Sequence, residues 1–172
     1  MKRKISKLKK EKYQIFSAEK VIYFCDPMFT SMVDSPEEEY EVNINPALNR
    51  HHIEFENVTC TIDSNCLDEI CDVFFFDWGG MSVGNSCLEH LCREIRKLAD
   101  DRPNTYYVVV SEFTQFAMID ALLEFGKEKP FNIFLDIDSF VEYFKKHKGT
   151  NPTRVRSGIA RSNVPARSAS RT

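Results

Sequence analysis

The chain lacks the signatures of several large classes of protein. Its six cysteines include no C-x₂-C pair, and Cys87 and Cys92 stand five positions apart, so no standard zinc site is present. No apolar run approaches the length of a membrane-spanning helix, and no apolar segment follows the basic start as in a signal peptide. No Gly-x-Ser-x-Gly turn and no recognisable Cys–His pair indicates nucleophilic catalysis. We therefore expect a soluble, cytoplasmic protein with reduced cysteines and no membrane partner.

The small net charge of −3 conceals a strong segregation of charge. Residues 1–12 carry a net +6 and residues 149–172 carry +5, which leaves −14 for residues 13–148. We expect a basic N-terminal arm (1–12), an α/β domain (13–148) and a disordered Arg/Ser-rich tail (149–172). Basic segments attract nucleic acid through counterion release, so nucleic acid is one expected partner of the tails. A protein partner or a second copy of the chain is the alternative.

Four short apolar runs each end close to a carboxylate. They are Val21–Cys25 before Asp26, Val73–Phe76 before Asp77, Val108–Val110 before Glu112, and Ile133–Leu135 before Asp136. Uninterrupted apolar runs of this length are typical of strands buried on both faces of a parallel sheet. Amphipathic helical patterns separate the later runs. Together they predict a three-layer, Rossmann-like α/β domain with a mostly parallel sheet of four to five strands, flanked by basic flexible tails.

Two segments before the second run are less regular. Residues 31–52 contain two X-Pro pairs and three consecutive glutamates, so we expect a long loop there, with a short extended piece at Tyr40–Ile44. Residues 53–62 alternate as a strand does but change phase at Glu56-Asn57, which predicts a bulge or a tight turn.

A glycine-bearing loop after the second run is the first candidate site. Residues 79–86, Gly-Gly-Met-Ser-Val-Gly-Asn-Ser, resemble the P-loop in frame and join a predicted strand to a predicted helix. Asn85 stands where the P-loop has lysine, so we expect phosphate binding by backbone N–H groups rather than an NTPase. Trp78 offers a ring for stacking. The alternatives are a sharp turn that needs glycine and a tryptophan that covers the core. The candidate ligand-binding residues are Asp77, Trp78, Gly79, Gly80, Ser82, Gly84, Asn85 and Ser86.

The strand-end carboxylates form the second candidate site. In a parallel sheet the carboxyl ends of the strands share one edge, so Asp77, Glu112, Asp136 and Asp138 are candidate ligands for Mg²⁺. Over residues 106–147, Glu112 followed by Asp136-Ile137-Asp138 resembles the Toprim pattern of a strand-end Glu and a later Asp-x-Asp. That resemblance implies magnesium-dependent phosphodiester chemistry. The alternative is structural, because Asp138 or Ser139 suits the N-cap of the following helix.

Three functions therefore stay open. The first is a binding or regulatory module that recognises a partner or a phosphorylated ligand at the strand ends while its basic tails contact nucleic acid. The second is a magnesium-dependent phosphoesterase or nuclease-like enzyme, and the third is a structural protein assembled through its basic arms. We favour the first, because no complete catalytic constellation is visible and a fold alone implies no activity.

Overall fold

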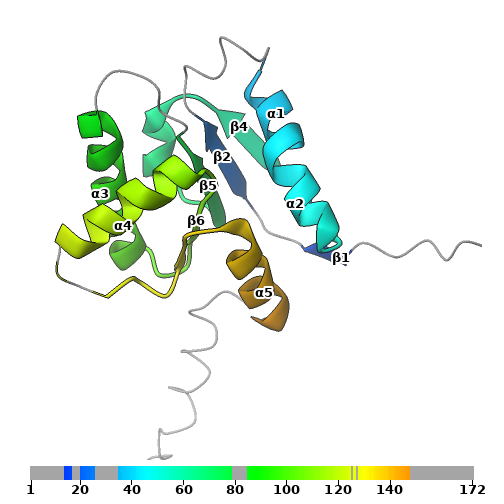
Figure 1. Ribbon diagram of the computed structural model, residues 1–172. Helices are drawn as coiled ribbons and strands as arrows, with labels where there is room; N and C mark the ends of the chain where they lie inside the picture. The colour runs from blue at the N-terminus through cyan, green and yellow to red at the C-terminus, as the bar shows by residue number, and fades with distance from the viewer. Residues whose placement is uncertain are drawn as a thin grey trace, which may run out of the picture.

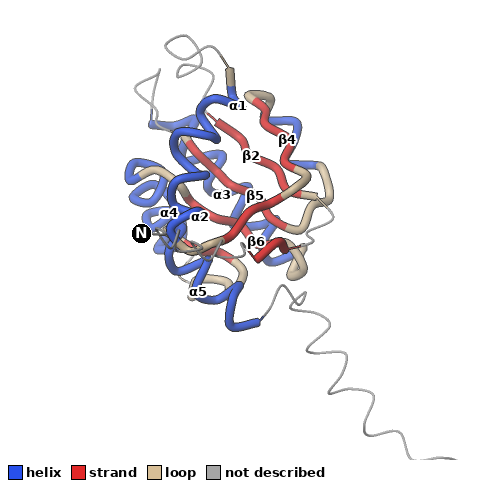
Figure 2. Tube along the Cα trace, turned by 90° about the vertical axis from the view of Figure 1, so that its right-hand side faces the viewer, coloured by secondary structure: helices blue, strands red, loops and turns tan. Residues whose placement is uncertain are grey.

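The computed structural model describes residues 14–16, 20–25, 35–78, 85–124, 126 and 128–147, and these form a parallel sheet covered by helices. Five strands lie in the order β4-β2-β5-β6-β7, each pair parallel. Their bounds are β2 Val21–Cys25, β4 Val58–Thr61, β5 Val73–Asp77, β6 Tyr106–Val109 and β7 Ile133–Phe134. Counted along the chain, the order is 2-1-3-4-5, the flavodoxin-like variant of the doubly wound sheet. The predicted three-layer, Rossmann-like fold is thus confirmed (Figure 2).

Helices cover both faces of the sheet (Figure 1). On one face pack α3 (Asn85–Asp101) and α4 (Glu112–Glu124). On the other lie α1 (Pro36–Glu39), the π-helix η2 (Tyr40–Ile44), α2 (Asn45–Arg50) and α5 (Ile137–His147). Side chains alternate along each strand and so supply both cores: Phe75 of β5 packs on the α5 side, and Phe74 and Phe76 pack on the α3 side.

The prediction of a loop over residues 31–52 is wrong for most of that segment, because residues 36–50 form one helical run. Ser35 caps this run, since its Oγ accepts a hydrogen bond from the backbone N–H of Glu38 at 3.2 Å. Pro36 occupies the first turn, where its missing N–H has no partner to lose. The next three residues are glutamates, whose negative charge is favourable near the positive N-terminal end of a helix. Ser-Pro-Glu-Glu was therefore a helix start, not a loop.

The π-helical turn lies directly before a proline. Pro46 has no N–H to donate to the fourth residue before it, and its ring crowds the preceding turn. At Asn45 the backbone N–H reaches back five residues, to the carbonyl of Tyr40. The wider turn keeps Tyr40, Ile44 and Leu48 buried against the sheet.

The phase change at Glu56-Asn57 separates two strands that belong to different sheets. β3 (Ile53–Phe55) pairs in parallel with β1 (Gln14–Phe16) in a two-stranded sheet, whereas β4 joins the main sheet. Ile53 and Phe55 are buried in the core on the α2 and α5 side. β1 and β3 therefore lie on the opposite side of the main sheet from α3 and α4.

Several predicted features lie outside the described residues. They are the arm 1–12, the tail 149–172, Asp26, and the loop positions Gly79, Gly80, Ser82 and Gly84. Asn85 and Ser86 are described as backbone in the first turn of α3, without their side chains. Within the described ranges, no helix combines the length and the apolar content that crossing a bilayer demands.

Candidate functional site

The end of β5 separates two cavities at the carboxyl edge of the sheet. Because side chains alternate along a strand, Asp77 faces the side of α5, as Phe75 does, and Trp78 faces the side of α3. A cavity of about 580 Å³ lies on the Asp77 side, and we call it the acidic cavity. A second, of about 400 Å³, lies on the Trp78 side, and we call it the tryptophan cavity.

The acidic cavity gathers side chains from distant parts of the chain. They come from α1 and η2, from the end of β5, from the segment joining β6 to α4, and from the first turns of α4 and α5. The lining residues are Glu39, Val42, Asn43, Asp77, Val110, Ser111, Glu112, Phe113 and Ile137. The order of strands reverses direction between β2 and β5, and doubly wound sheets bind ligands at the carboxyl edge beside this switch point.

Two buried carboxylates and the exposed Glu112 give the acidic cavity its charge. Asp77 and Glu39 are each only 7% exposed. The hydroxyl of Tyr23 donates to Asp77 Oδ2 at 2.8 Å, and the side-chain amide of Asn43 donates to the carboxylate of Glu39. Burial, reinforced by the charge of Asp77, raises the pKa of Tyr23 far above its ordinary value, so this hydroxyl remains a hydrogen-bond donor.

Two hydroxyls connect the walls of the two cavities. Ser111 Oγ lies 2.6 Å from Thr114 Oγ1 and donates to the carbonyl oxygen of Trp78 at 3.2 Å. Thr114 Oγ1 donates to the same carbonyl at 2.8 Å and accepts from the N–H of Trp78 at 3.0 Å. Ser111 Oγ also accepts a hydrogen bond from the backbone N–H of Thr114, so Ser111 caps the N-terminus of α4. The first turn of α4 is therefore fixed to the end of β5.

The tryptophan cavity has an aromatic wall. The indole of Trp78 stacks on Phe24 with ring centroids 5.9 Å apart, and Phe24 stacks on Phe76 at 5.7 Å. The cavity is lined by Phe24, Ile62, Ser64, Trp78, Cys87, His90 and Leu91. Trp78 thus covers one end of the core and also lines a cavity, and the stacking of a ligand on it stays a prediction.

The predicted magnesium ligands divide into two groups. Asp77 and Glu112 line the acidic cavity together. Asp136 and Asp138 are absent from its lining. Nowhere in the described part of the chain are three Asp, Glu, His or Cys side chains placed to share one metal ion. A magnesium site built from the four predicted residues stays a prediction, and the geometry lends it no support.

Asp136 and Asp138 have structural partners instead. Asp136 caps α5, since its carboxylate accepts from the N–H of Ser139 at 2.7 Å and from the Ser139 hydroxyl at 2.8 Å. Asp138 Oδ1 lies 2.7 Å from Nε2 of His51, at the end of α2. The expectation that Asp138 or Ser139 is the N-cap is wrong, because the helix begins at Ile137, earlier than the apolar pattern suggested.

Sequence reasoning missed three polar residues of the acidic cavity, Glu39, Asn43 and Ser111, and all of its apolar wall. Glu39 and Asn43 belong to the segment expected to be a loop, although the helix-start signal at Ser35 would have placed them on a helix. Ser111 contacts the backbone of Trp78 from 33 positions away, and no local pattern encodes such a pair.

The arrangement can accept hydrogen bonds and can hold positive charge inside a partly apolar pocket. The cavity volume lies within the range of about 300–1,000 Å³ that is usual for small-ligand sites. Comparisons of the chain with models of protein families, with curated proteins and with solved structures find no match.

Proposed function

We propose that this chain is a binding or regulatory module and that the acidic cavity is its recognition site. The observation that carries the proposal is the pair of buried carboxylates, Asp77 and Glu39, in the wall of one cavity at the carboxyl edge. Removing a carboxylate from water costs several kcal/mol, on the order of the stability of a whole domain. Apolar side chains would fill this space at less cost, so the charges favour a role in recognition.

The wall also indicates which ligand fits. Carboxylates accept hydrogen bonds and attract cations, while Val42, Val110 and Phe113 supply apolar surface. We therefore propose that the ligand, or the side chain of a protein partner, presents an ammonium or guanidinium group on an apolar stem. A phosphate would be repelled by Asp77 and Glu39, so phosphate binding is proposed only for the loop 79–84 and the start of α3.

Ligand-observed NMR with a library of small amines, guanidines, carboxylates and phosphates tests the proposal. We expect amines or guanidines to bind the full chain and to lose binding in Val42→Trp, which fills the acidic cavity from an exposed position. Ile62→Trp is the matched control, because Ile62 is also exposed but lines the tryptophan cavity. Hits lost only in Ile62→Trp, or hits confined to phosphates, would contradict the proposal.

The basic tail extends the proposal to nucleic acid. Residues 149–172 carry five arginines and no acid. Such a segment binds phosphate backbones through counterion release, so its affinity should fall steeply as salt rises. Fluorescence anisotropy with short DNA and RNA, comparing the full chain with residues 1–148, measures this. Equal affinities of the two proteins would remove the tail from the proposal.

A further inference from the structure

An apolar stripe runs along the outer face of α4. Phe113, Phe116 and Leu123 are 63%, 58% and 73% exposed. They lie three and seven positions apart, so the 100° step of an α-helix returns them to one side. The opposite side of α4 is buried through Thr114, Met118, Ala121 and Leu122. A helix that is apolar on both sides is usually covered on both, so the stripe indicates a docking surface.

Acidic side chains share this outer face. Asp120 is exposed and lies between Phe116 and Leu123, and Glu112 is exposed at the start of α4. Glu124 at the other end is paired with Arg93 of α3 at 2.6 Å. The helix Glu112–Glu124 contains no basic residue. Two copies pairing through α4 would bring like charges together, which disfavours a symmetric helix–helix contact. The occupant that fits has apolar side chains and positive charge.

The N-terminal arm of this chain has both properties. Residues 1–12 carry a net charge of +6, and Ile5 and Leu8 are spaced to share one face of a helix. The tail 149–172 fits less well, because its few large apolar residues are scattered among proline, glycine and serine. The arm therefore matches α4 in charge and in apolar spacing.

The arm of the same molecule has too little chain to reach α4. The arm leads into β1, which pairs with β3 on the side of the sheet opposite to α4 (Figure 1). Leu8 is six residues from Gln14, a span of at most about 20 Å when fully extended. Crossing from β1 to α4 takes about 20 Å through two packed layers and more around the edge. In a fully extended arm, moreover, Ile5 and Leu8 would no longer share the one face that the helical spacing gives them.

We propose that the basic arm 1–12 of one copy of this chain docks on the apolar, acidic face of α4 in a second copy. Arm exchange in both directions gives a two-fold dimer, the commonest closed assembly. Lysines of the arm meet Asp120 and Glu112, while Ile5 and Leu8 cover Phe116 and the rest of the stripe. Exposed charge pairs are screened by salt, so the dimer weakens as ionic strength rises.

Sedimentation velocity of the full chain at low and high salt tests the proposal. We expect a dimer at low salt that is lost on deletion of residues 1–12 and weakened about tenfold or more in Phe116→Ser, because exposed aromatic anchors often dominate an interface. Asp120→Lys should weaken it as well. The control Glu142→Lys makes the same charge change at an exposed position of α5, on the other face of the sheet, and should leave the dimer intact.

Mixing two defective proteins separates arm exchange from other modes of association. A protein without residues 1–12 still presents α4, and the Phe116→Ser, Asp120→Lys double variant still carries its arm. Their mixture should form a heterodimer, although neither forms a homodimer. A full chain that stays monomeric at low salt would overturn the proposal. This includes the case in which the arm binds α4 of its own molecule. A dimer that persists without residues 1–12 would overturn it too.

Discussion

The two edges of the sheet are built from similar polar residues but use them differently. At the amino edge, the side-chain amide of Asn132 donates to the carbonyls of Ala99, Arg102 and Thr105 at 2.9–3.1 Å. Thr105 Oγ1 donates to the carbonyl of Cys71 at 2.6 Å. These side chains satisfy backbone carbonyls at the end of α3 and in the segments that enter β5 and β6. At the carboxyl edge, Asp77 and Glu39 line a cavity.

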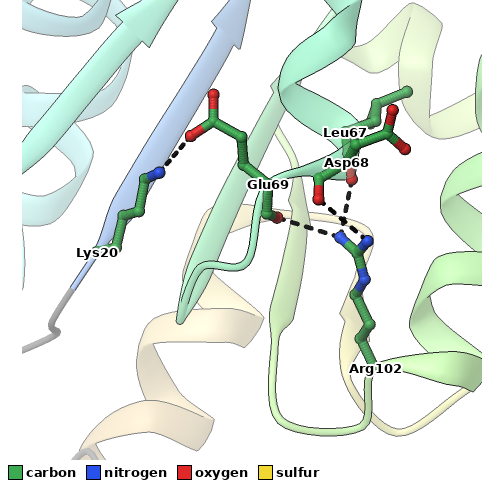
Figure 3. A network of polar contacts seen from close by, with 5 residues as sticks. All are labelled: Lys20, Leu67, Asp68, Glu69 and Arg102. Atoms are coloured by element: carbon green, nitrogen blue, oxygen red, sulfur yellow. Dashed lines mark hydrogen bonds and ion pairs between the residues drawn. The ribbon is translucent and has the colours of Figure 1, made fainter.

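Arg102 shows how thoroughly the amino edge is connected (Figure 3). Its guanidinium donates to the carbonyl oxygens of Leu67, Asp68 and Glu69 at 2.8–3.2 Å, and so caps the 3₁₀-helix η3 (Ser64–Asp68). The carboxylate of Glu69 is paired with Lys20, the residue before β2. One arginine thus links the C-terminus of α3 to the helix that precedes β5.

Under the proposed function, the amino edge serves stability and the carboxyl edge serves recognition. At the amino edge, the Asn132 amide N–H groups and the Thr105 hydroxyl meet backbone carbonyls, and buried donors that find such partners stabilise a fold. Buried carboxylates beside a cavity carry a desolvation cost that a ligand with opposite charge would offset. Substitutions at the amino edge should therefore reduce stability, and substitutions at the carboxyl edge should reduce binding.

The largest expected effect on stability is that of Asn132→Ala. This change leaves the carbonyls of Ala99 and Thr105 without their donor in a buried site, and we expect a loss of about 3 kcal/mol in the free energy of unfolding. Urea denaturation monitored by circular dichroism measures it. The control is Glu39→Gln at the carboxyl edge, which keeps an oxygen to accept from Asn43 and removes a buried charge, so we expect a loss below about 1 kcal/mol. Equal losses would end the distinction between the edges.

A smaller effect is expected for Asp77→Asn. The amide oxygen can still accept from Tyr23, and the cost of a buried charge disappears, so the free energy of unfolding at pH 7 should change by no more than about 1 kcal/mol. Binding of amines or guanidines in the acidic cavity should be lost in the same variant. Thermal denaturation and ligand-observed NMR on one preparation give both values. A loss of stability as large as that of Asn132→Ala would make Asp77 a structural residue.

The sequence predicted the sheet better than its edges. Buried runs such as Val21–Cys25 are local and strongly apolar, and the strands β2, β5, β6 and β7 begin and end within a residue or two of the predicted runs. The helical run 36–50 is hard to predict because Pro36 and Pro46 are typical of loops, although the first lies in the opening turn and the second follows a π-helical turn.

The candidate site was harder to predict because it depends on strand order and on direction. Asp77 and Trp78 are adjacent in sequence, yet side chains alternate along the strand, so the two residues line different cavities. Asp136 ends an apolar run as Asp77 does, but the start of α5 uses it as a cap. Whether a strand-end carboxylate faces a cavity or caps a helix depends on the elements that pack around it, which the sequence next to it does not reveal.

The smallest effect expected here compares two thiols as pH rises. Burial, with the nearby charge of Asp72, raises the pKa of Cys71 at the amino edge from about 9 to about 12. The neutral thiol is thus favoured in the folded state. Its contribution to stability is complete below pH 9 and is lost as pH rises toward 12, by about 1 kcal/mol between pH 8 and pH 10.

Urea denaturation of Cys71→Ala at pH 8 and pH 10 measures this contribution. Between pH 8 and pH 10, the free energy of unfolding of the variant should fall by about 1 kcal/mol less than that of the parent protein. This difference does not depend on how stable the variant is at pH 8. Cys87→Ala is the control, because Cys87 is exposed beside the tryptophan cavity, and it should follow the parent protein. If Cys87→Ala and Cys71→Ala show the same dependence on pH, Cys71 is accessible to solvent and the amino edge is looser than its hydrogen bonds indicate.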